Sequence, residues 1–374
     1  MIRVAIVRGA FLNNFEMQNY NFLQEDIKIT AFSSKNPIHK EFSFETVKLP
    51  SLYVRSKDTY GVSVSQAINF LANRAIGDSQ ILFGLERYLS NFDIVHTADP
   101  HYYYSYQAAR LRFLGKIKKL VVTSWETIPF NNESVGRKKA NKYFVLEHAD
   151  CFLCYTQQAK DCLIKEGVNA NKIFVIPLGV ELQKFSPYSK KNSENLSVLF
   201  VGRLVEEKGV LDLYNAFTTL PHPRYILEIV GEGPLKKILT QNIKRDSLDS
   251  YINLQQRSYQ DMPRVYKEAD IFVLPSKKTK TWEEQYGMVL IEAMASGLPI
   301  LASKSGAIPE VVGDTAILFE EGNVEQLRSA LLKADDKKVR EQYSRKALER
   351  SKKYFDAEEV SKSIYRFYCK TLGL

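Results

Sequence analysis

Cysteine is scarce in this sequence, and its four cysteines do not form the pattern of a zinc site. Cys151 and Cys154 make one C-x-x-C, but no second pair and no paired histidines accompany it. The pair lies in the run ADCFLCYT, which is typical of a buried strand, where free cysteine behaves as a small hydrophobic residue. We therefore expect buried thiols, a reducing cytoplasmic setting and no metal.

Long apolar runs are also absent. No stretch approaches the ~20 residues needed to span a membrane, and the start MIRVAIV resembles a short strand rather than a signal peptide. Low-complexity tracts and short internal repeats are missing as well. With 374 residues, 45% of them hydrophobic and 25% charged, the chain has the composition of a soluble protein of two domains. We expect it in the cytoplasm, with at most a peripheral place at the inner face of the membrane.

Acidic residues are outnumbered, which gives a net charge of +9 and favours anionic partners. Residues 1–186 hold 23 lysines and arginines against 17 acids. Nucleic acid is not expected, because no helix-turn-helix or aromatic RNA-binding strand is evident. The segments 102–120 and 136–142 combine aromatic with basic residues. They form either a solvated face or a surface that contacts an anionic membrane.

Short β-branched runs alternate with amphipathic stretches along the whole chain, which predicts βαβ units and parallel sheets. The polar, aperiodic run 180–197 interrupts this alternation and contains Pro187, so we interpret it as a linker. The fold class is therefore α/β with two doubly wound, Rossmann-like domains, and ligands are expected beyond the carboxyl ends of the strands. The predicted strands lie at 1–9, 27–33, 92–99, 118–126, 151–156, 172–179, 197–202, 224–233, and in YINLQQ, ADIFVLPS and PILASKSG.

A cationic loop follows the first strand of the second domain, in FVGRLVEEKGV. Gly202 ends the strand and allows close approach of a ligand. Arg203 offers a planar fork of donors for phosphate oxygens, and Lys208 adds a compact charge next to a helix start. The loop predicts a diphosphate site, although it is not a Walker A loop. The turn GEGP, with Gly231, follows the next strand and is either structural or part of the same site.

Two carboxylates flank a helix start in EEQYGMVLIEAMASGLPI. The backbone N–H groups of Gly287, Met288 and Val289 lack intrahelical acceptors there and can bind an anion. Glu284 precedes the helix and can bind sugar hydroxyls. Glu292 lies inside it among apolar neighbours, so it needs a hydrogen-bond partner, and a ribose diol would supply one.

These motifs, in this order, resemble those of the group 1 retaining glycosyltransferases of GT-B fold. The resemblance rests on FVGRLVEEKGV, ADIFVLPS, the E-x₇-E with EAMASGLPI, SGAIPEVV, IPLGVELQKF and DIVHTADP, and it covers nearly the whole chain. It implies a GT-B architecture, with two domains facing across a cleft. The first domain (1–182) would bind the acceptor and the second (183–354) the nucleotide sugar, with a C-terminal helix (355–374) crossing back to the first.

The resemblance also implies roles at matching positions. Arg203 and Lys208 would hold the diphosphate, Glu284 the donor sugar and Glu292 the ribose. The loop from Gly9 to Asn14 would touch the diphosphate. Further donor contacts are implied for the backbone amides of Gly287, Met288 and Val289. His96 matches a family position and is either a further donor contact or a hydrogen-bonded structural histidine.

The sequence departs from the family pattern at two places. Relatives carry a double glycine where this chain has NNFE, so the bulk of Asn14 alters the expected phosphate contact. Relatives often place a donor-contacting histidine where this chain has Trp125. Trp125 either stacks on a sugar or belongs to the core, and Glu126 either receives the acceptor's proton or is structural. We expect no cofactor beyond the nucleoside-diphosphate sugar as co-substrate.

The leading hypothesis from the sequence is thus a transferase that moves a sugar from a nucleoside-diphosphate sugar to a glycan or lipid-linked acceptor with retention. It would serve the synthesis of a cell-envelope or surface polysaccharide or glycoconjugate. Two alternatives remain open, a nucleotide-sugar epimerase and an inactive nucleotide-sugar-binding subunit. The donor sugar, its base and the acceptor are not specified by the sequence.

Overall fold

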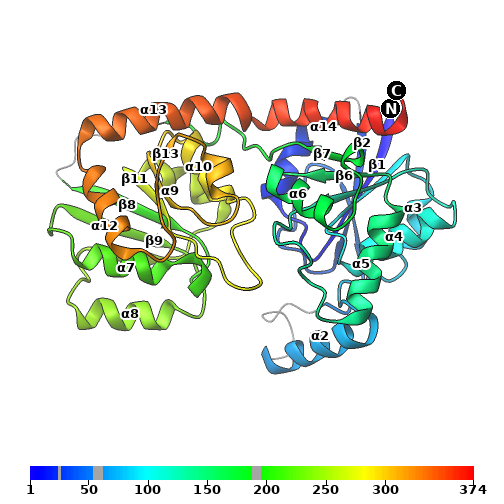
Figure 1. The fold of residues 1–374 in the computed structure, drawn as a ribbon, viewed down its shortest axis with the longest axis horizontal. Helices are drawn as coiled ribbons and strands as arrows, with labels where there is room; N and C mark the ends of the chain where they lie inside the picture. Colours follow the sequence, from blue (N-terminus) through cyan, green and yellow to red (C-terminus); the bar gives the residue numbers. More distant parts are fainter. Residues whose placement is uncertain (24–26, 54–61, 188–194) are drawn as a thin grey trace. The chain divides into compact units, whose positions relative to one another are not determined.

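The computed structural model describes residues 1–23, 27–53, 62–187 and 195–374, with side chains from residue 69 onward in the helix at 62–76. Two compact units make up the chain (Figure 1). Unit 1 comprises Met1–Leu178 and Ala357–Leu374, and unit 2 comprises Gly179–Asp356. The boundaries expected from the sequence, 182/183 and 354/355, differ from these by four residues and two residues.

Unit 1 is built on a seven-stranded parallel sheet with the order β3-β2-β1-β4-β5-β6-β7. The sheet order reverses between β1 and β4, which makes their carboxyl ends the expected ligand crevice. Its elements are β1 (Ile2–Gly9), α1 (Asn14–Met17), η1 (Gln18–Leu23), β2 (Ile27–Ser34), β3 (Glu45–Leu49), α2 (Val62–Ile76), α3 (Glu86–Leu89), β4 (Ile94–Ala98), α4 (Tyr103–Phe113), β5 (Leu120–Ser124), α5 (Gly136–His148), β6 (Cys151–Cys154), α6 (Gln157–Lys165), η2 (Ala170–Lys172), β7 (Ile173–Val175) and α14 (Ala357–Leu372).

Unit 2 is built on a six-stranded parallel sheet with the order β10-β9-β8-β11-β12-β13. Here the order reverses between β8 and β11. Its elements are β8 (Leu196–Val201), η3 (Glu206–Lys208), α7 (Val210–Thr218), β9 (Tyr225–Val230), α8 (Lys236–Arg245), β10 (Ile252–Gln255), η4 (Tyr259–Asp261), α9 (Met262–Lys267), β11 (Ile271–Leu274), α10 (Met288–Ala295), β12 (Ile300–Ser303), α11 (Ile308–Val312), β13 (Ala316–Phe319), α12 (Val324–Lys333) and α13 (Lys337–Tyr354).

Each sheet has its own apolar core, because its central strands are buried on both faces, as parallel sheets require. In unit 2, alternate residues of β8 and β9 pack with α7, α8 and α12. In unit 1, β1, β4, β5 and β6 pack with α4 and α5. The predicted α/β class with two Rossmann-like doubly wound domains is confirmed.

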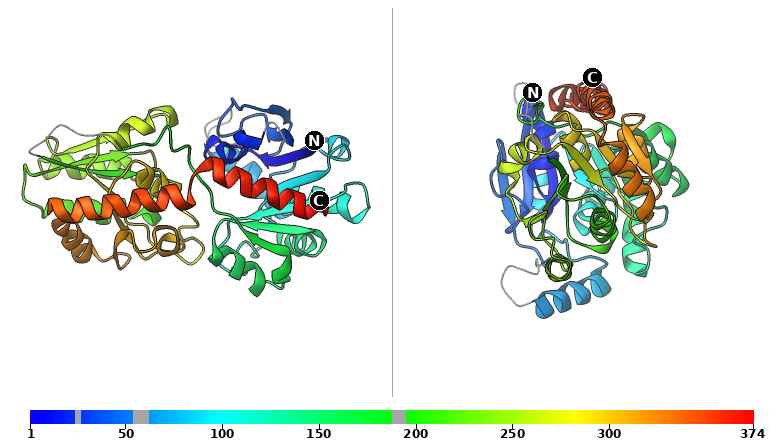
Figure 2. Two further views of the ribbon diagram at one scale, coloured as in Figure 1. Left: turned by 90° about the horizontal axis from the view of Figure 1, so that it is seen from above. Right: turned by 90° about the vertical axis from the view of Figure 1, so that its left-hand side faces the viewer.

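The C-terminal helix α14 belongs to unit 1 and packs on η1 of that unit, as expected (Figure 2). Its apolar face carries Val360, Ile364, Phe367 and Tyr368, all buried. The chain therefore passes between the units twice. Near both crossings, Val180 forms a parallel bridge with Asp356 and donates its N–H to the Phe355 carbonyl at 2.8 Å.

Three expectations about local structure need correction or limits. The predicted helix at MQNYNFLQ is mostly the 3₁₀ segment η1. The predicted linker 180–197 includes residues 188–194, which lie outside the described part, and its end already forms β8. Cys154 and Cys162 are buried thiols as expected, whereas Cys151 and Cys369 are partly exposed. Among the described residues, none of the helices has the length and apolar character of a membrane span.

Candidate functional site

The reversal point of unit 2 gathers four loops, each of which follows a strand or opens a helix. Glycine makes their close approach possible. A Cβ at Gly209 would lie 1.9 Å from the Pro275 carbonyl oxygen, and one at Gly306 would lie 2.3 Å from that of Glu284. Both glycines have positive φ, +65° and +51°. The loops after β8, β11 and β12 are thereby pressed into one surface.

Lys208 and Glu284 meet at this surface from positions 76 residues apart. Lys208 Nζ lies 2.6 Å from Glu284 Oε2, and Ser276 Oγ donates to the same oxygen at 2.8 Å. The side chains are 14% and 8% exposed, so the pair is partly screened from water but not sealed off. The ammonium also lies 4.9 Å from the centroid of the Trp282 ring. The sequence assigned both residues to one ligand, and the structure brings them together.

Arg203 is the more exposed of the two cations at this site. Its side chain is 62% exposed and pairs only loosely with Glu207, at 3.3 Å. A surface pair of this kind is worth little, so the guanidinium is free to move to an anion. Gly202, beside it, lies directly under the next loop, because a Cβ at Gly231 would stand 1.9 Å from the Gly202 carbonyl oxygen. Gly231 therefore has a structural role in joining the loops after β8 and β9.

The first turn of α10 lies next to Glu284. Gly287 is the N-cap in the left-handed conformation, with φ 80°, and a Cβ there would lie 3.6 Å from Glu284 Cγ. Met288 and Val289 follow and are partly exposed. The first N–H groups of a helix have no acceptor within the helix and carry partial positive charge. The turn thus offers donors beside the Lys208–Glu284 pair.

Glu292, deeper in α10, has a protein partner that the sequence did not suggest. Tyr266 donates its hydroxyl to Glu292 Oε2 at 2.7 Å, and Phe185 packs against the Tyr266 ring. Burial raises the pKa of Glu292 to about 7, while hydrogen bonds from Tyr266 and Tyr259 act to lower it. The side chain is 3% exposed. Its predicted contact with a ribose stays a prediction, and the tyrosines explain how the burial is tolerated.

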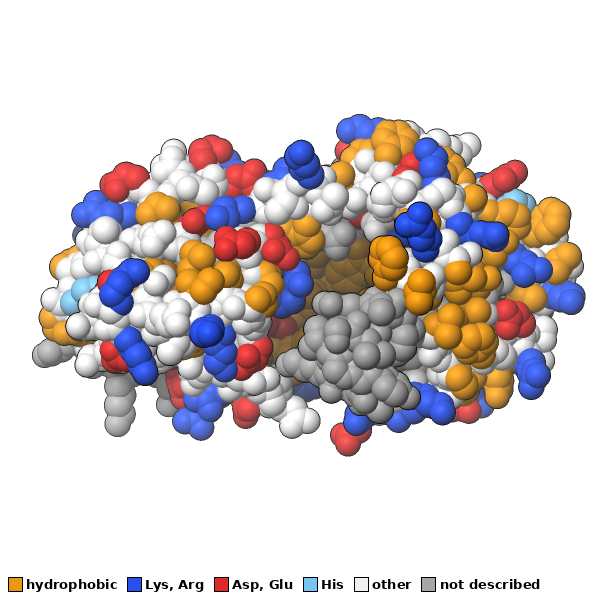
Figure 3. All heavy atoms as spheres, turned by 90° about the horizontal axis from the view of Figure 1, so that it is seen from below, with side chains coloured by type: hydrophobic (Ala, Val, Ile, Leu, Met, Phe, Trp, Pro, Cys, Tyr) orange, Lys and Arg blue, Asp and Glu red, His pale blue; other side chains and the backbone are white. Residues whose placement is uncertain are grey.

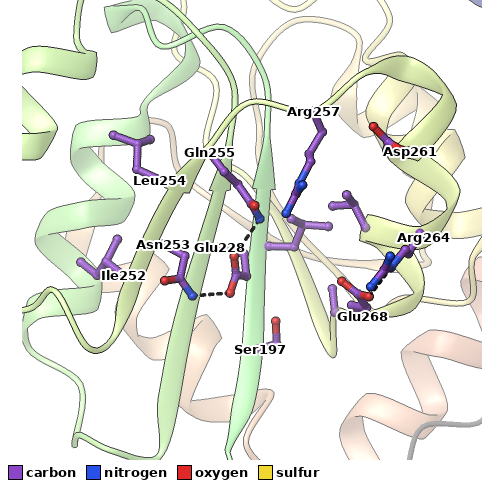
Figure 4. Close-up of a pocket in the computed structure, with 13 residues that line it drawn as sticks. Ser197, Glu228, Ile252, Asn253, Leu254, Gln255, Arg257, Asp261, Arg264 and Glu268 are labelled. Carbon is purple, nitrogen blue, oxygen red and sulfur yellow. Dashed lines mark hydrogen bonds and ion pairs between the residues drawn. The ribbon is translucent and has the colours of Figure 1, made fainter.

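A cavity of about 670 Å³ lies elsewhere on unit 2, on the face of β8, β9 and β10 (Figure 4). Glu228 accepts hydrogen bonds from Asn253 and Gln255 there, and Arg257 and Arg264 stand at its rim. It is lined by these strands and by the segment from Arg257 to Ala269, which includes α9, and Lys208 and Glu284 are not among its lining residues. Among the described residues, no three His, Cys, Asp or Glu side chains are grouped to hold a metal ion.

At the reversal point of unit 1, Arg8 and Glu16 form a buried ion pair under the loop that starts at Gly9. Arg8 Nη2 lies 2.7 Å from Glu16 Oε1, with side chains 2% and 3% exposed. Tyr155 donates to the same oxygen at 2.7 Å. Gly9 is buried with φ +54°, and the N–H of Asn14 donates to His39 Nδ1 at 3.0 Å. The buried Arg8–Glu16 ion pair thus holds this loop in place. The motif NNFE, which contains Glu16, did not predict this pair.

For His96, the structure favours the structural interpretation, and its predicted contact with a donor stays a prediction. The side chain is fully buried, and its two ring nitrogens lie 2.6 Å from the Tyr368 hydroxyl and 2.7 Å from Thr123 Oγ1. Burial and the Arg8 charge lower the pKa of His96 well below its usual value, so the ring is neutral. Its role here is to tie α14 to β4 and β5. The apolar face of the C-terminal helix was the only sequence signal for this contact.

Asp99, directly after β4, was missed as a candidate. It has φ 46°, an uncommon value for a residue with a side chain, and its Oδ1 accepts the Trp125 N–H at 3.0 Å. Burial raises its pKa to about 7, with Glu126 and Glu16 raising and Arg8 lowering it. A carboxyl group with this pKa changes charge near neutral pH and can hydrogen-bond a hydroxyl in either state. The position of Asp99 directly after strand β4 is the sequence feature that could have identified it as a candidate.

Trp125 and Glu126 follow β5 beside Asp99. The Trp125 ring is partly exposed and packs edge-on against Tyr155, with centroids 4.4 Å apart. Glu126 Oε1 accepts the N–H groups of Thr127 and Ile128, and Oε2 accepts the side-chain amides of Asn131 and Asn132. Burial raises the pKa of Glu126. These four bonds favour the structural interpretation of Glu126, as the residue that shapes the loop after β5.

Comparison with known proteins connects this geometry to a family. The profile of the family described as "Glycosyl transferases group 1" matches residues 183–350, and that described as "Glycosyltransferase Family 4" matches residues 41–184. The first match spans the Lys208–Glu284 site, and the second covers Asp99 and Trp125. The chain belongs to the group 1 glycosyltransferases.

Relatives of this group 1 glycosyltransferase include proteins of several organisms. The sulfoquinovosyl transferase SQD2 of Arabidopsis thaliana is 30% identical over 52% of this chain and 39% of its own. An Escherichia coli protein named UDP-Gal:alpha-D-GlcNAc-diphosphoundecaprenol alpha-1,3-galactosyltransferase is 29% identical over 71% of this chain and 72% of its own. The chain thus spans well under half of the first relative and nearly three quarters of the second.

Solved structures show that the fold is GT-B. HepE of Anabaena, in complex with UDP, superposes with a TM-score of 0.77 at 16% identity, covering 99% of this chain and 100% of that one. Sucrose-phosphate synthase of Thermosynechococcus elongatus gives a TM-score of 0.75 at 16% identity, with both chains covered in full. At such identities the likeness establishes the fold of this glycosyltransferase and not its ligand.

Proposed function

We propose that this group 1 glycosyltransferase moves a sugar from a nucleoside-diphosphate sugar to a glycan or lipid-linked acceptor and retains the anomeric configuration. It would act in the synthesis of a cell-envelope or surface polysaccharide or glycoconjugate. The observation that carries the proposal is the meeting of Lys208, Glu284 and the start of α10 at the reversal point of unit 2. The names of the relatives, among them an E. coli galactosyltransferase for a diphosphoundecaprenol-linked sugar, support the acceptor class.

The site is suited to stabilising a leaving diphosphate. In the transfer, the bond between the anomeric carbon and the phosphate oxygen breaks, and a bond from that carbon to the acceptor oxygen forms. Negative charge develops on the leaving oxygen, where Lys208, Arg203 and the first N–H groups of α10 supply fixed positive charge. The acceptor's proton passes to the leaving phosphate oxygen on the same face, so no protein base is required in unit 2.

Glu284 has a separate role in this proposal, as a binder of donor-sugar hydroxyls. Its Oε2 is already engaged by Lys208 and Ser276, while Oε1 has no described partner. The ion pair holds the carboxylate in a fixed orientation before the sugar arrives, which reduces the entropic cost of binding. When a diphosphate approaches, Lys208 can share its three N–H donors between phosphate and carboxylate.

Unit 1 would supply the acceptor site at its own reversal point. Asp99 and Trp125 are the side chains there with a capacity to bind sugars, through a carboxylate and an indole face. Trp125 is partly exposed, whereas Asp99 is buried, at 8% exposed. The departure from the family at Trp125 lies beside Asp99, so the two residues can be tested together. Residues 1–178 then bind the acceptor, and residues 179–356 the nucleotide sugar.

Incubation with a panel of nucleoside-diphosphate sugars tests the proposal. The purified protein should release nucleoside diphosphate slowly from one donor, and faster when a lipid-diphosphate-linked sugar is added. Retention is checked by NMR of the anomeric proton in the product. Isomerisation of the sugar without release would identify an epimerase. Binding without turnover, with every acceptor tried, would identify an inactive binding subunit.

A further inference from the structure

A row of aromatic side chains lies between α4 and α5 of unit 1. We call it the aromatic strip, and it consists of Tyr103, Tyr106, Phe113, Phe144 and His148. Each ring contacts the next: the Tyr103–Tyr106, Tyr106–Phe144 and Phe113–Phe144 centroids lie 5.5, 5.4 and 5.9 Å apart, and Phe144 stacks on His148 at 4.1 Å. Phe113 is exposed and the other four rings are partly exposed, and Tyr106 and Phe144 also pack against the apolar core of unit 1.

The end of the aromatic strip projects into solvent. Phe113 is 65% exposed and the adjacent Leu114 is 55% exposed. Exposure of two adjacent large apolar side chains to water is energetically unfavourable. Exposed apolar residues on protein surfaces otherwise usually occur singly. On this half of the molecule, Figure 3 shows hydrophobic side chains interspersed with lysine and arginine.

Cations border the aromatic strip on both helices. Arg110 lies two turns along α4 from Tyr103, and Arg137 lies in the first turn of α5, and both are exposed. Neither Arg110 nor Arg137 has an ion-pair partner among the described residues, and Lys116 follows Leu114. Of the nearby acids, Glu86 on α3 accepts a hydrogen bond from Gln107, and Glu147 on α5 lies beside His148. Glu133, just before α5, pairs with Lys139 and Lys142.

We propose that the aromatic strip, with Leu114 and its flanking cations, docks this protein on an anionic lipid surface. Aromatic rings with polar edges favour the interfacial layer of a bilayer, and Phe113 and Leu114 can enter its apolar boundary. Arg110, Lys116 and Arg137 complement phosphate headgroups. This inference deepens the proposed function, because a lipid-linked acceptor is reached only from a membrane surface.

Vesicle co-sedimentation tests the proposal without any need for turnover. The protein should bind vesicles of phosphatidylglycerol and phosphatidylcholine, and bind pure phosphatidylcholine much more weakly. The variant R110E/R137E should bind the anionic vesicles about tenfold or more weakly, since each basic residue near such a surface contributes substantially. K237E/R345E, in unit 2, changes the net charge by the same amount at exposed positions and should bind like the wild type.

A second pair of variants separates the apolar part. F113S/L114S should weaken binding to the anionic vesicles severalfold, whereas I238S/L332S, at exposed apolar positions of unit 2, should not. Circular dichroism confirms folding of each variant. Equal loss in the two charge variants, or no binding by the wild type, overturns the proposal. Donor hydrolysis in solution reports on the proposed function separately and should be unchanged in all four variants.

Discussion

The two reversal points, of unit 1 and unit 2, occupy the same place in sheets of the same order but differ in their chemistry. In unit 1, the crevice after β1 and β4 rests on a buried ion pair, Arg8–Glu16, with side chains 2% and 3% exposed. In unit 2, the crevice after β8 and β11 holds Lys208–Glu284, with side chains 14% and 8% exposed, beside the open Arg203. The shared topology thus determines where the crevice of each unit lies. The degree of burial determines whether a charged pair at that crevice has a structural role.

The difference follows from solvation. A charge removed from water must be fully paired, and Arg8 satisfies this with Glu16 and the His96 carbonyl. Lys208 keeps some access to water and Arg203 most of it, so both can exchange partners for an incoming anion. In unit 1, hydrogen bonding separates the remaining candidates. Glu126 accepts four hydrogen bonds and both ring nitrogens of His96 have protein partners, whereas the Asp99 carboxylate accepts the Trp125 N–H.

The largest expected effect is on stability. Replacement of Arg8 by Met should reduce the free energy of unfolding by about 3–5 kcal/mol, because Glu16 is left buried without its cation. Urea unfolding followed by circular dichroism measures this. Arg203→Met serves as the control, since its exposed pair is worth under about 1 kcal/mol. Equal effects of the two changes would remove the contrast between the units.

Glu284→Gln should lower turnover by about 100-fold, because the amide keeps the shape of the carboxylate but loses the charge that orients Lys208 and the sugar hydroxyls. The steady-state rate of nucleoside-diphosphate release measures it. Glu207→Gln, which removes the partner of Arg203, should keep at least half of the wild-type rate. Activity near the wild-type level in Glu284→Gln would exclude the assigned role.

Lys208→Ala should weaken binding of a nucleoside diphosphate by about tenfold, and Arg203→Ala by a few-fold, since the exposed cation loses more side-chain entropy on binding. Isothermal titration with UDP and GDP gives both affinities. A larger loss of affinity in Lys208→Ala than in Arg203→Ala would show that the ion-paired cation contributes more to binding than the exposed one. Unchanged affinity in both variants would argue against a phosphate site.

The smallest expected effect concerns the pH dependence of stability. Because burial raises the pKa of Asp99 to about 7 from 3.8, the native state holds a proton that the unfolded state releases between these values. Stability contributed by this group therefore falls as pH rises from about 4 to 7. Asp99→Asn removes the dependence, so its stability relative to the wild type should rise as pH increases over that window.

Unfolding midpoints at pH 4.5, 6 and 8 check this expectation for Asp99→Asn. Glu292 is a matched comparison in unit 2, because burial raises its pKa to about 7 as well. Glu292→Gln should therefore show the same sign. A parallel pH profile of wild type and Asp99→Asn would show that Asp99 is ionised throughout and accessible to water.

Periodicity was sufficient for most strands and helices of the fold. It failed at η1, where Asn13 caps a short helix and the chain continues as a 3₁₀ segment. It also did not predict β3 or β13, which are short edge strands of their sheets. An edge strand is buried on fewer sides, so its composition is less distinctive.

In the candidate site, residues could be predicted where their position after a strand suggests a function. They could not be predicted where their properties depend on contacts with residues distant in the sequence. Lys208 and Glu284 were identified from their loops. Asp99 was not, because its pKa depends on Glu126, Glu16 and Arg8, which come from three different segments. The contact of His96 with Tyr368 could not be predicted either, because the two residues lie 272 positions apart.

The sequence by itself determined that this chain forms two parallel α/β sheets, and which loops lie at their carboxyl ends, because hydrophobic period and loop chemistry are local properties. Only the tertiary structure decided the protonation and exposure of each charged side chain. Burial and long-range pairing set the free energy of a charge, and neither is encoded in the residues next to it.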